Sequence, residues 1–165
     1  MTERNRQARA NTIREEFLDT LRSTGLLVRK VRDLADAASD PDIRSMMLDL
    51  GRAGREVYSV SGIGLIHIRV RSEPPGWWNI LKTVKNHFDL LSPLFKCYYI
   101  LLIGRTDQHI ADGYIVTDLD QPPFLRQPGD ETTKYTVNER QHLDLSKCLL
   151  SIDKVARTLG LSGSA

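Results

Sequence analysis

Residues 97–103 read CYYILLI, the longest apolar run in a chain of 165 residues. A run that is apolar at every position is typical of a strand whose two faces are both covered. It is too short to span a bilayer, which takes about 20 apolar residues in a helix. The sequence therefore predicts a buried central strand here, with other elements packed on both of its faces.

Three further strands are predicted on either side of this run. Downstream, residues 114–116 form an apolar segment after a polar loop over 104–113, and a short strand is expected at 134–137. Upstream, apolar and polar residues alternate over 66–71, so a strand there would bury one set and present the other on its opposite face. These segments and the central run predict a four-stranded sheet.

The N-terminal third of the chain has helical periodicity. A heptad-like seam follows a capping box at Thr12. Its positions are Phe17, Leu21, Thr24, Val28, Val31, Ala35 and Ala38. A second helix is expected to begin with Asp40 as N-cap and Pro41 as its first residue. Residues 1–55 are therefore predicted to form a helical hairpin, whose seam either covers the chain's own domain or pairs with another chain.

Two more helices complete the predicted fold. One runs over 77–91, and the other begins near Asp144 and ends at Gly160. The order α-α-β-α-β-β-β-α predicts an α+β or mixed α/β fold, in which an N-terminal helical hairpin precedes a four-stranded sheet with flanking helices. Residues 56–165 are expected to form the α+β domain and to pack with the hairpin as one compact unit.

Charge and cysteine content restrict the function classes. The chain has 23 Lys and Arg against 21 Asp and Glu, and a net charge of +2 excludes binding of nucleic acid by bulk charge. Cys97 and Cys148 cannot build a disulfide framework and are expected to be reduced thiols. The first ten residues lack the apolar stretch of an export signal. We therefore expect a cytoplasmic protein without a membrane partner.

The polar face of the 66–71 strand carries the candidate binding residues. His67, Arg69 and Arg71 are expected about 7 Å apart along this face, and Lys82 and Lys85 lie one turn apart on the following helix. The forked guanidinium of Arg suits phosphate oxygens, so this row predicts contacts to a nucleic-acid backbone. The alternative is structural: the polar face of a half-buried strand meets solvent, and its cations protect a sheet edge.

Two adjacent tryptophans follow the candidate row. On a helix their rings would lie about 100° apart, so Trp77 could sit in the core while Trp78 remains at the rim. Trp78 is therefore predicted to be an auxiliary contact that could stack on an unpaired base. The alternative is that its ring caps the end of the sheet.

No catalytic residue, metal site or cofactor is predicted from the sequence motifs. No strand carries an Asp followed by Glu-x-Lys, no phosphate-binding glycine loop or nucleophile elbow occurs, and the histidines lack metal-ligand spacing. Asp107, His109 and Asp112 share one loop and are the remaining metal candidates, with a solvated hairpin as the alternative.

Four segments resemble small domains of restriction and other prokaryotic defence proteins related to the PD-(D/E)XK nuclease fold. They are HIRVR from His67, GWWNILK from Gly76, YYILLIG from Tyr98 and DGYIV from Asp112. The resemblance covers about residues 62–138 and implies a sheet that faces nucleic acid. It also implies loss of metal-dependent cleavage, because arginines stand on the strand where an acidic residue and its lysine partner would be sought.

Three functions follow from these observations. The first is a non-catalytic nucleic-acid-binding or nucleic-acid-associated domain of a prokaryotic restriction or defence system, which uses the basic strand face. The alternative is a protein–protein interaction module that forms a homodimer, or binds a partner protein, through the N-terminal helices. The second alternative is a divergent metal-dependent nuclease.

Overall fold

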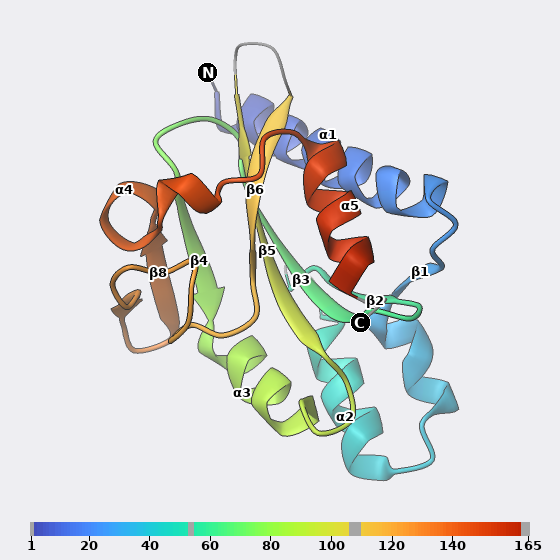
Figure 1. Cartoon of the computed structure of the whole chain (residues 1–165). Helices are drawn as coiled ribbons and strands as arrows, with labels where there is room; N and C mark the ends of the chain where they lie inside the picture. The colour runs from blue at the N-terminus through green and yellow to red at the C-terminus, as the bar shows by residue number, and fades with distance from the viewer. Residues whose placement is uncertain (1, 53–54, 106–109, 163–165) are drawn as a thin grey trace.

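The computed structural model of this protein describes residues 2–52, 55–105 and 110–162. Its centre is a five-stranded mixed sheet in the order β1-β2-β3-β5-β6 (Figure 1). The strands of this large sheet are β1 (Val28–Lys30), β2 (Val57–Val60), β3 (Gly64–Arg71), β5 (Cys97–Gly104) and β6 (Ala111–Val116). The predicted buried strand at 97–103 is confirmed, because β5 is paired on both edges and its last seven residues are buried.

The large sheet is antiparallel except at its centre, where β3 and β5 run parallel. A parallel pair needs a connection that crosses from one end of the sheet to the other. Here the crossover consists of β4 (Trp77–Leu81) and α3 (Lys82–Leu91). β4 pairs with β8 (Lys134–Asn138), which also pairs with β7 (Gly129–Asp130), so that the crossover begins in a separate three-stranded antiparallel sheet.

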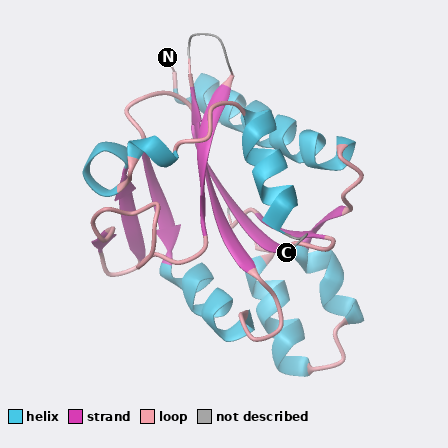
Figure 2. Ribbon diagram, viewed as in Figure 1, coloured by secondary structure: helices cyan, strands magenta, loops and turns pink. Residues whose placement is uncertain are grey.

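Other elements cover both faces of the large sheet, as Figure 2 shows. One face carries α1 (Glu3–Ser23) and α5 (Ile152–Ser162), which pack against each other. The opposite face carries the 3-10 helix η1 (Val31–Ala37), α2 (Pro41–Leu50), α3 and the small sheet. The short helices α4 (Glu139–His142) and η2 (Leu145–Lys147) connect β8 to α5.

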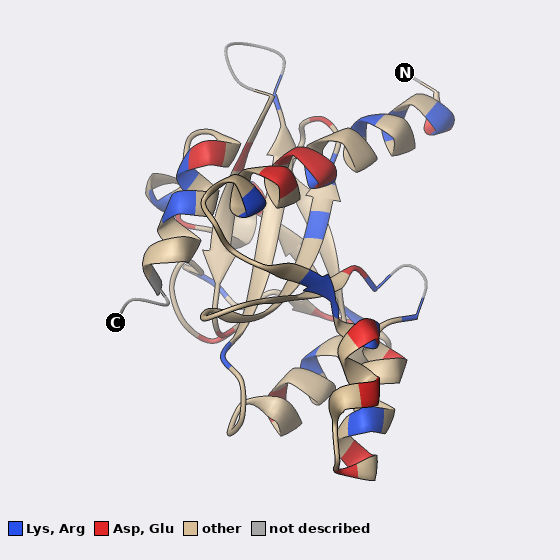
Figure 3. Cartoon of the chain, turned by 90° about the vertical axis from the view of Figure 1, so that its right-hand side faces the viewer, with Lys and Arg blue, Asp and Glu red and all other residues tan. Residues whose placement is uncertain are grey.

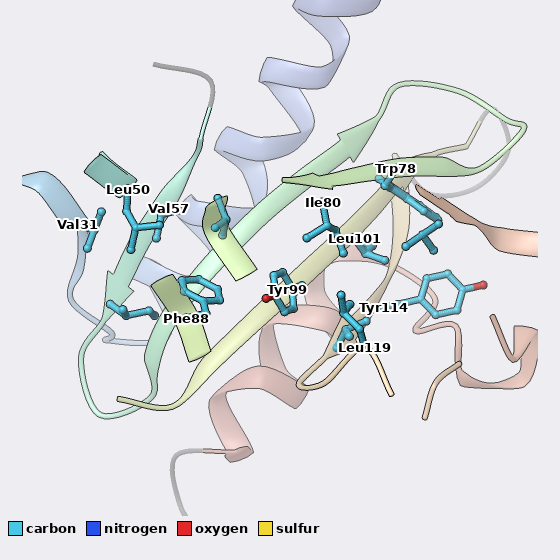
Figure 4. Packing of buried hydrophobic residues seen from close by; sticks show 14 of the residues in the cluster. Val31, Leu50, Val57, Trp78, Ile80, Phe88, Tyr99, Leu101, Tyr114 and Leu119 are labelled. Carbon is cyan, nitrogen blue, oxygen red and sulfur yellow. The ribbon is translucent and has the colours of Figure 1, made fainter. Parts of the chain in front are cut away.

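Alternate side chains of β5 enter two separate apolar cores. Ile100 and Leu102 pack on the face covered by α1 and α5. Tyr99 and Leu101 enter the other core, where Phe88 of α3 meets the ring of Tyr99 (Figure 4). The apolar residues are thus gathered between layers, and within the described ranges no helix combines the length and apolar content that a membrane span needs.

The predicted helical hairpin is wrong, because its two helices lie on opposite faces of the large sheet. The first helix begins at Glu3, where the Thr2 hydroxyl accepts a hydrogen bond from the Asn5 amide (3.2 Å). Its apolar seam does not continue through the predicted heptads. Gly25 has a φ of +89° just after the helix end, and Val28 then enters β1 beside β2.

The prediction of one four-stranded sheet is also wrong, whereas the α+β class is confirmed. The helix predicted over 77–91 begins as a strand, because β8 offers a partner to β4 and the alternate residues Trp78 and Ile80 are buried there. The last helix begins at Ile152, since Asp144 caps η2 and not α5.

Gly64 begins β3, and we expect this position to tolerate no side chain. Its φ is +143°, and an added Cβ would lie 2.1 Å from the Lys96 carbonyl oxygen, which accepts from the Leu65 amide. Gly64→Ala should therefore lower the free energy of unfolding by roughly 3 kcal/mol. The matched control is Gly62→Ala: its φ is +78° with no atom within 4 Å, so it should cost roughly 1 kcal/mol. Chemical denaturation measures both, and equal losses would contradict this packing.

Candidate functional site

His67 does not reach the molecular surface, although the sequence predicted it as a phosphate contact. Its exposed fraction is 0%, and its ring meets the edge of Tyr99 at a centroid distance of 6.3 Å. The reason is that β3 is an internal strand and both of its faces are covered at this level. The two ring nitrogens make no hydrogen bond within the part of the chain that the structure describes.

The surroundings of His67 keep its imidazole neutral. Burial, and secondarily the positive charge of Arg69, lower the pKa of His67 from 6.5 to about 3. A neutral ring inside the protein cannot attract a phosphate at the surface. The row predicted on β3 therefore begins only at Arg69.

Arg69 and Arg71 lie toward the end of β3 and are both half-buried. Burial, and then the nearby guanidinium of Arg14, lower the pKa of Arg69. Arg71 is held differently: its Nε donates to the Pro75 carbonyl (3.1 Å), and its guanidinium carbon lies 4.7 Å from the centre of the Trp77 ring. Its Nη1 and Nη2 groups make no hydrogen bond or ion pair within the described residues.

The structure does not bring Lys82 and Lys85 to this row. Lys82 pairs with Asp130 of β7, and its ammonium lies 5.1 Å from the centre of the Tyr135 ring. Lys85 pairs with Asp89 one turn along α3 at 2.6 Å. Both cations are thus neutralised by carboxylates near the small sheet and α3.

The two tryptophans have the reverse of their predicted positions. Trp78 is 2% exposed, and its indole N–H donates to the Leu102 carbonyl at 2.9 Å. Trp77 is 38% exposed. The exchange follows from secondary structure, since neighbouring residues of a strand point to opposite faces. Trp77, and not Trp78, is therefore the aromatic ring available at the surface.

A surface depression of about 250 Å³ lies beside β1 and β2, in a region that the sequence analysis did not select. Three cations line it: Lys30 at the end of β1, Arg32 in η1, and Arg52 just after α2. The remaining lining residues are Leu50, Gly51, Glu56, Val57 and Tyr58. Figure 3 shows blue, basic segments on β1, on β3 and just after α2 at this side of the molecule.

The charges around the depression leave it positive. Lys30 and Arg32 form no ion pair within the described ranges. The charge of Glu56 is offset by Arg14, whose Nε lies 3.6 Å from its carboxylate, and the Tyr58 hydroxyl donates to the same group at 2.7 Å. Burial and then this hydrogen bond raise the pKa of Tyr58, so it stays neutral.

A sequence signal for the depression was present in the segment RKVR, which begins at Arg29 and holds three cations in four positions. The heptad-like seam, which includes Val28 and Val31, predicted that this segment belongs to a helix. In the structure it crosses from β1 into η1, and it places Lys30 and Arg32 on the rim of one depression. A short strand followed by a 3-10 turn has no strong periodicity, which is why the signal was not recognised.

A second polar cluster joins the small sheet to the large one. Tyr114 donates to Glu139 at 2.5 Å, and Arg105 bridges Glu139 (3.3 Å) and Asp112 (3.0 Å). Asp112 also accepts from the Ser151 amide at 3.0 Å, which anchors the segment before α5. Because these groups satisfy one another in the interior, their arrangement stabilises the contact between layers.

The structure describes only one of the three metal candidates of the sequence analysis, Asp112. Asp107 and His109 lie outside the described residues, and Asp112 is engaged by Arg105. Among the described residues no group of three His, Cys, Asp or Glu side chains could hold a metal ion. The described surface carries a depression lined by three cations and, toward the end of β3, the half-buried Arg69 and Arg71.

We expect the buried His67 to make the fold sensitive to acid. Because its pKa is about 3 in the fold against 6.5 ordinarily, stability is complete above pH 6.5 and is lost as the pH falls toward 3. Between pH 7.5 and pH 5 this residue should account for about 2 kcal/mol of lost stability. His67→Leu should remove that part of the loss, as measured by urea denaturation across this range.

All other titratable and charged groups, including Arg55 and Arg69 near the ring, are present both in the wild type and in His67→Leu. The difference between the two pH profiles therefore reports His67. If the stabilities of the two proteins fall in parallel, the imidazole is not held neutral by the fold.

Comparisons with known proteins were made at three levels: family models, curated proteins and solved structures. None of the three found a match to this chain. The functional argument therefore depends on the geometry of the basic depression and the neighbouring arginines.

Proposed function

We propose that this protein is a non-catalytic nucleic-acid-binding domain that holds a phosphate backbone against the basic depression and the adjacent end of β3. The observation that carries the proposal is the depression of about 250 Å³ with three cations on its wall. Two of them, Lys30 and Arg32, have no carboxylate partner within the described residues. Cations left unpaired in a concave surface attract an anionic ligand from solution.

The extent of the basic surface favours a polymer over a single small anion. Val57 at the depression is opposite His67 in the β2–β3 register, and Arg71 lies four residues further along β3. At about 3.3 Å per residue the two ends are roughly 13 Å apart. Arg69 lies between them on β3. Such a length accommodates several consecutive phosphates of one strand.

The proposal of binding without cleavage concerns the depression and the carboxylate that lines it. Glu56, the carboxylate nearest the depression, is engaged by Arg14 and Tyr58, so it is poorly placed to hold a metal ion. The resemblance over residues 62–138 adds to the proposal, because it implies a sheet that faces nucleic acid in a restriction or defence protein. The alternative of a divergent metal-dependent nuclease is tested directly by a cleavage assay with magnesium or manganese.

The alternative function, binding of a second copy or a partner protein through the N-terminal helices, has less support than nucleic-acid binding. Phe17 and Leu21 of the heptad-like seam are 0% exposed, and they pack into the chain's own core beneath α1. Val31 and Ala35 are also 0% exposed, in the core of the opposite face. These side chains are therefore not available to a second chain while the domain is folded.

Binding to labelled DNA and RNA over a series of salt concentrations tests the proposal. The double variant Lys30→Ala with Arg32→Ala should weaken binding at least tenfold, because each lost phosphate contact removes counterion release. It should also make the dependence of log affinity on log salt shallower by up to about 2.

The matched control is Lys147→Ala with Lys154→Ala, which removes two exposed cations from η2 and α5, outside the depression. It should change the affinity less than twofold. Equal weakening by both double variants would mean that general charge, and not the depression, drives binding. No binding by the wild type at low salt would refute the proposed function.

A further inference from the structure

The surface where β3 ends combines a cation and an aromatic ring in one rigid unit. The guanidinium of Arg71 lies over Trp77 with its central carbon 4.7 Å from the ring centre. Stacking of this kind orients both groups and leaves the edge of the guanidinium free to donate hydrogen bonds. We define this unit, Arg71 together with Trp77, as the Arg–Trp platform.

Two contacts keep the platform open to an anion. The Pro75 carbonyl accepts from Nε of Arg71 at 3.1 Å, which fixes the side chain and leaves both terminal nitrogens unbonded within the described residues. Glu73, the carboxylate nearest in sequence, is occupied by Arg6 at 3.2 Å. The arginine therefore has no competing carboxylate there and can present two parallel donors to a phosphate.

The tryptophan remains accessible although the arginine covers part of it. Trp77 is 38% exposed, while the neighbouring ring of Trp78 is buried and bonded to the large sheet. β4 holds Trp77 in a five-residue ladder with β8, where it lies opposite Asn138. A large ring fixed by a strand and left partly open to solvent is the geometry on which nucleic-acid bases stack.

We propose that the Arg–Trp platform makes this domain select single-stranded nucleic acid, with Arg71 binding a phosphate and Trp77 stacking on the adjoining unpaired base. This inference rests on the proposed function, since it names the form of nucleic acid that the same basic surface receives. Stacking needs a base face that is exposed. In a duplex both faces of every internal base are covered by neighbours, so the platform contributes nothing there except the phosphate contact.

The preference for single strands follows because the cations bind phosphates, which both forms present, whereas Trp77 binds an exposed base, which only a single strand presents. Lys30 and Arg32 attract phosphates of either form, so they raise the affinity for single strands and duplexes alike. Trp77 adds to the affinity for single strands alone. Stacking of one base on an aromatic side chain corresponds to roughly tenfold in affinity.

The test measures binding of one 15-nucleotide sequence, as a single strand and as its duplex, at fixed salt by fluorescence anisotropy. The wild type should bind the single strand about tenfold more tightly. Trp77→Leu should bind the single strand about tenfold more weakly than the wild type, and its affinity for the duplex should stay within twofold of the wild type. Trp77→Phe, which retains a ring, should bind the single strand within threefold of the wild type.

Tryptophan fluorescence supplies a second readout that a purely structural role would not move. Binding of the single strand should quench the emission of the wild type. In Trp77→Phe only Trp78 remains, and because it is 2% exposed its emission should be unaffected by the oligonucleotide. Thermal unfolding and near-ultraviolet circular dichroism of each variant verify that the fold is retained.

Each outcome separates this inference from the proposed function. If Trp77→Leu binds the single strand like the wild type, or if wild-type affinities for the two forms are equal, the platform is not a stacking site. The proposed function then still stands wherever Lys30→Ala with Arg32→Ala weakens binding of both forms. If the wild type binds neither form at low salt, both proposals are overturned.

Discussion

The structure depends on the parallel pairing of β3 with β5 in the interior of the large sheet. Two parallel neighbours cannot be joined by a tight turn, so the chain must leave the sheet and return to the opposite end. In this protein the crossover carries its own strand, β4, which recruits β8 and β7 into a second sheet. The same pairing requires cover on both faces, which α1 and α5 supply on one side and α2, α3 and the small sheet on the other.

This cover explains where the charged residues of β3 can act. At the level of His67 the strand is enclosed, and its imidazole is kept neutral by burial. Two and four residues further along, the same face emerges beside the crossover, and Arg69 and Arg71 are half-buried. A single alternating strand thus passes from core to surface along its length. The candidate basic surface therefore takes in the end of β3 and the neighbouring depression beside β1 and β2.

The apolar run was sufficient to predict the strand over 97–103, and the capping residue Asp40 with Pro41 was sufficient to predict the start of α2. They were insufficient wherever a partner distant in sequence decides the outcome. Trp77 fits a helical stripe with the residues that follow it, and only the ladder with β8 makes β4 a strand and exchanges the positions of the two indoles. His67 likewise follows a regular polar alternation, but the packing of α2, α3 and the small sheet on that face of β3 depends on long-range contacts that local alternation does not reveal.

A near-neutral chain can still offer a strongly basic surface if carboxylates are used where they are structurally needed. Asp49 at the end of α2 pairs with Arg52 (3.3 Å), with Arg55 (3.0 Å) and with His87 (3.1 Å). It thereby ties the segment after α2 to α3. Lys30 and Arg32, which also line the depression, have no carboxylate partner within the described residues. The net charge of +2 therefore limits long-range attraction, and the proposed affinity for a phosphate backbone relies on Lys30 and Arg32.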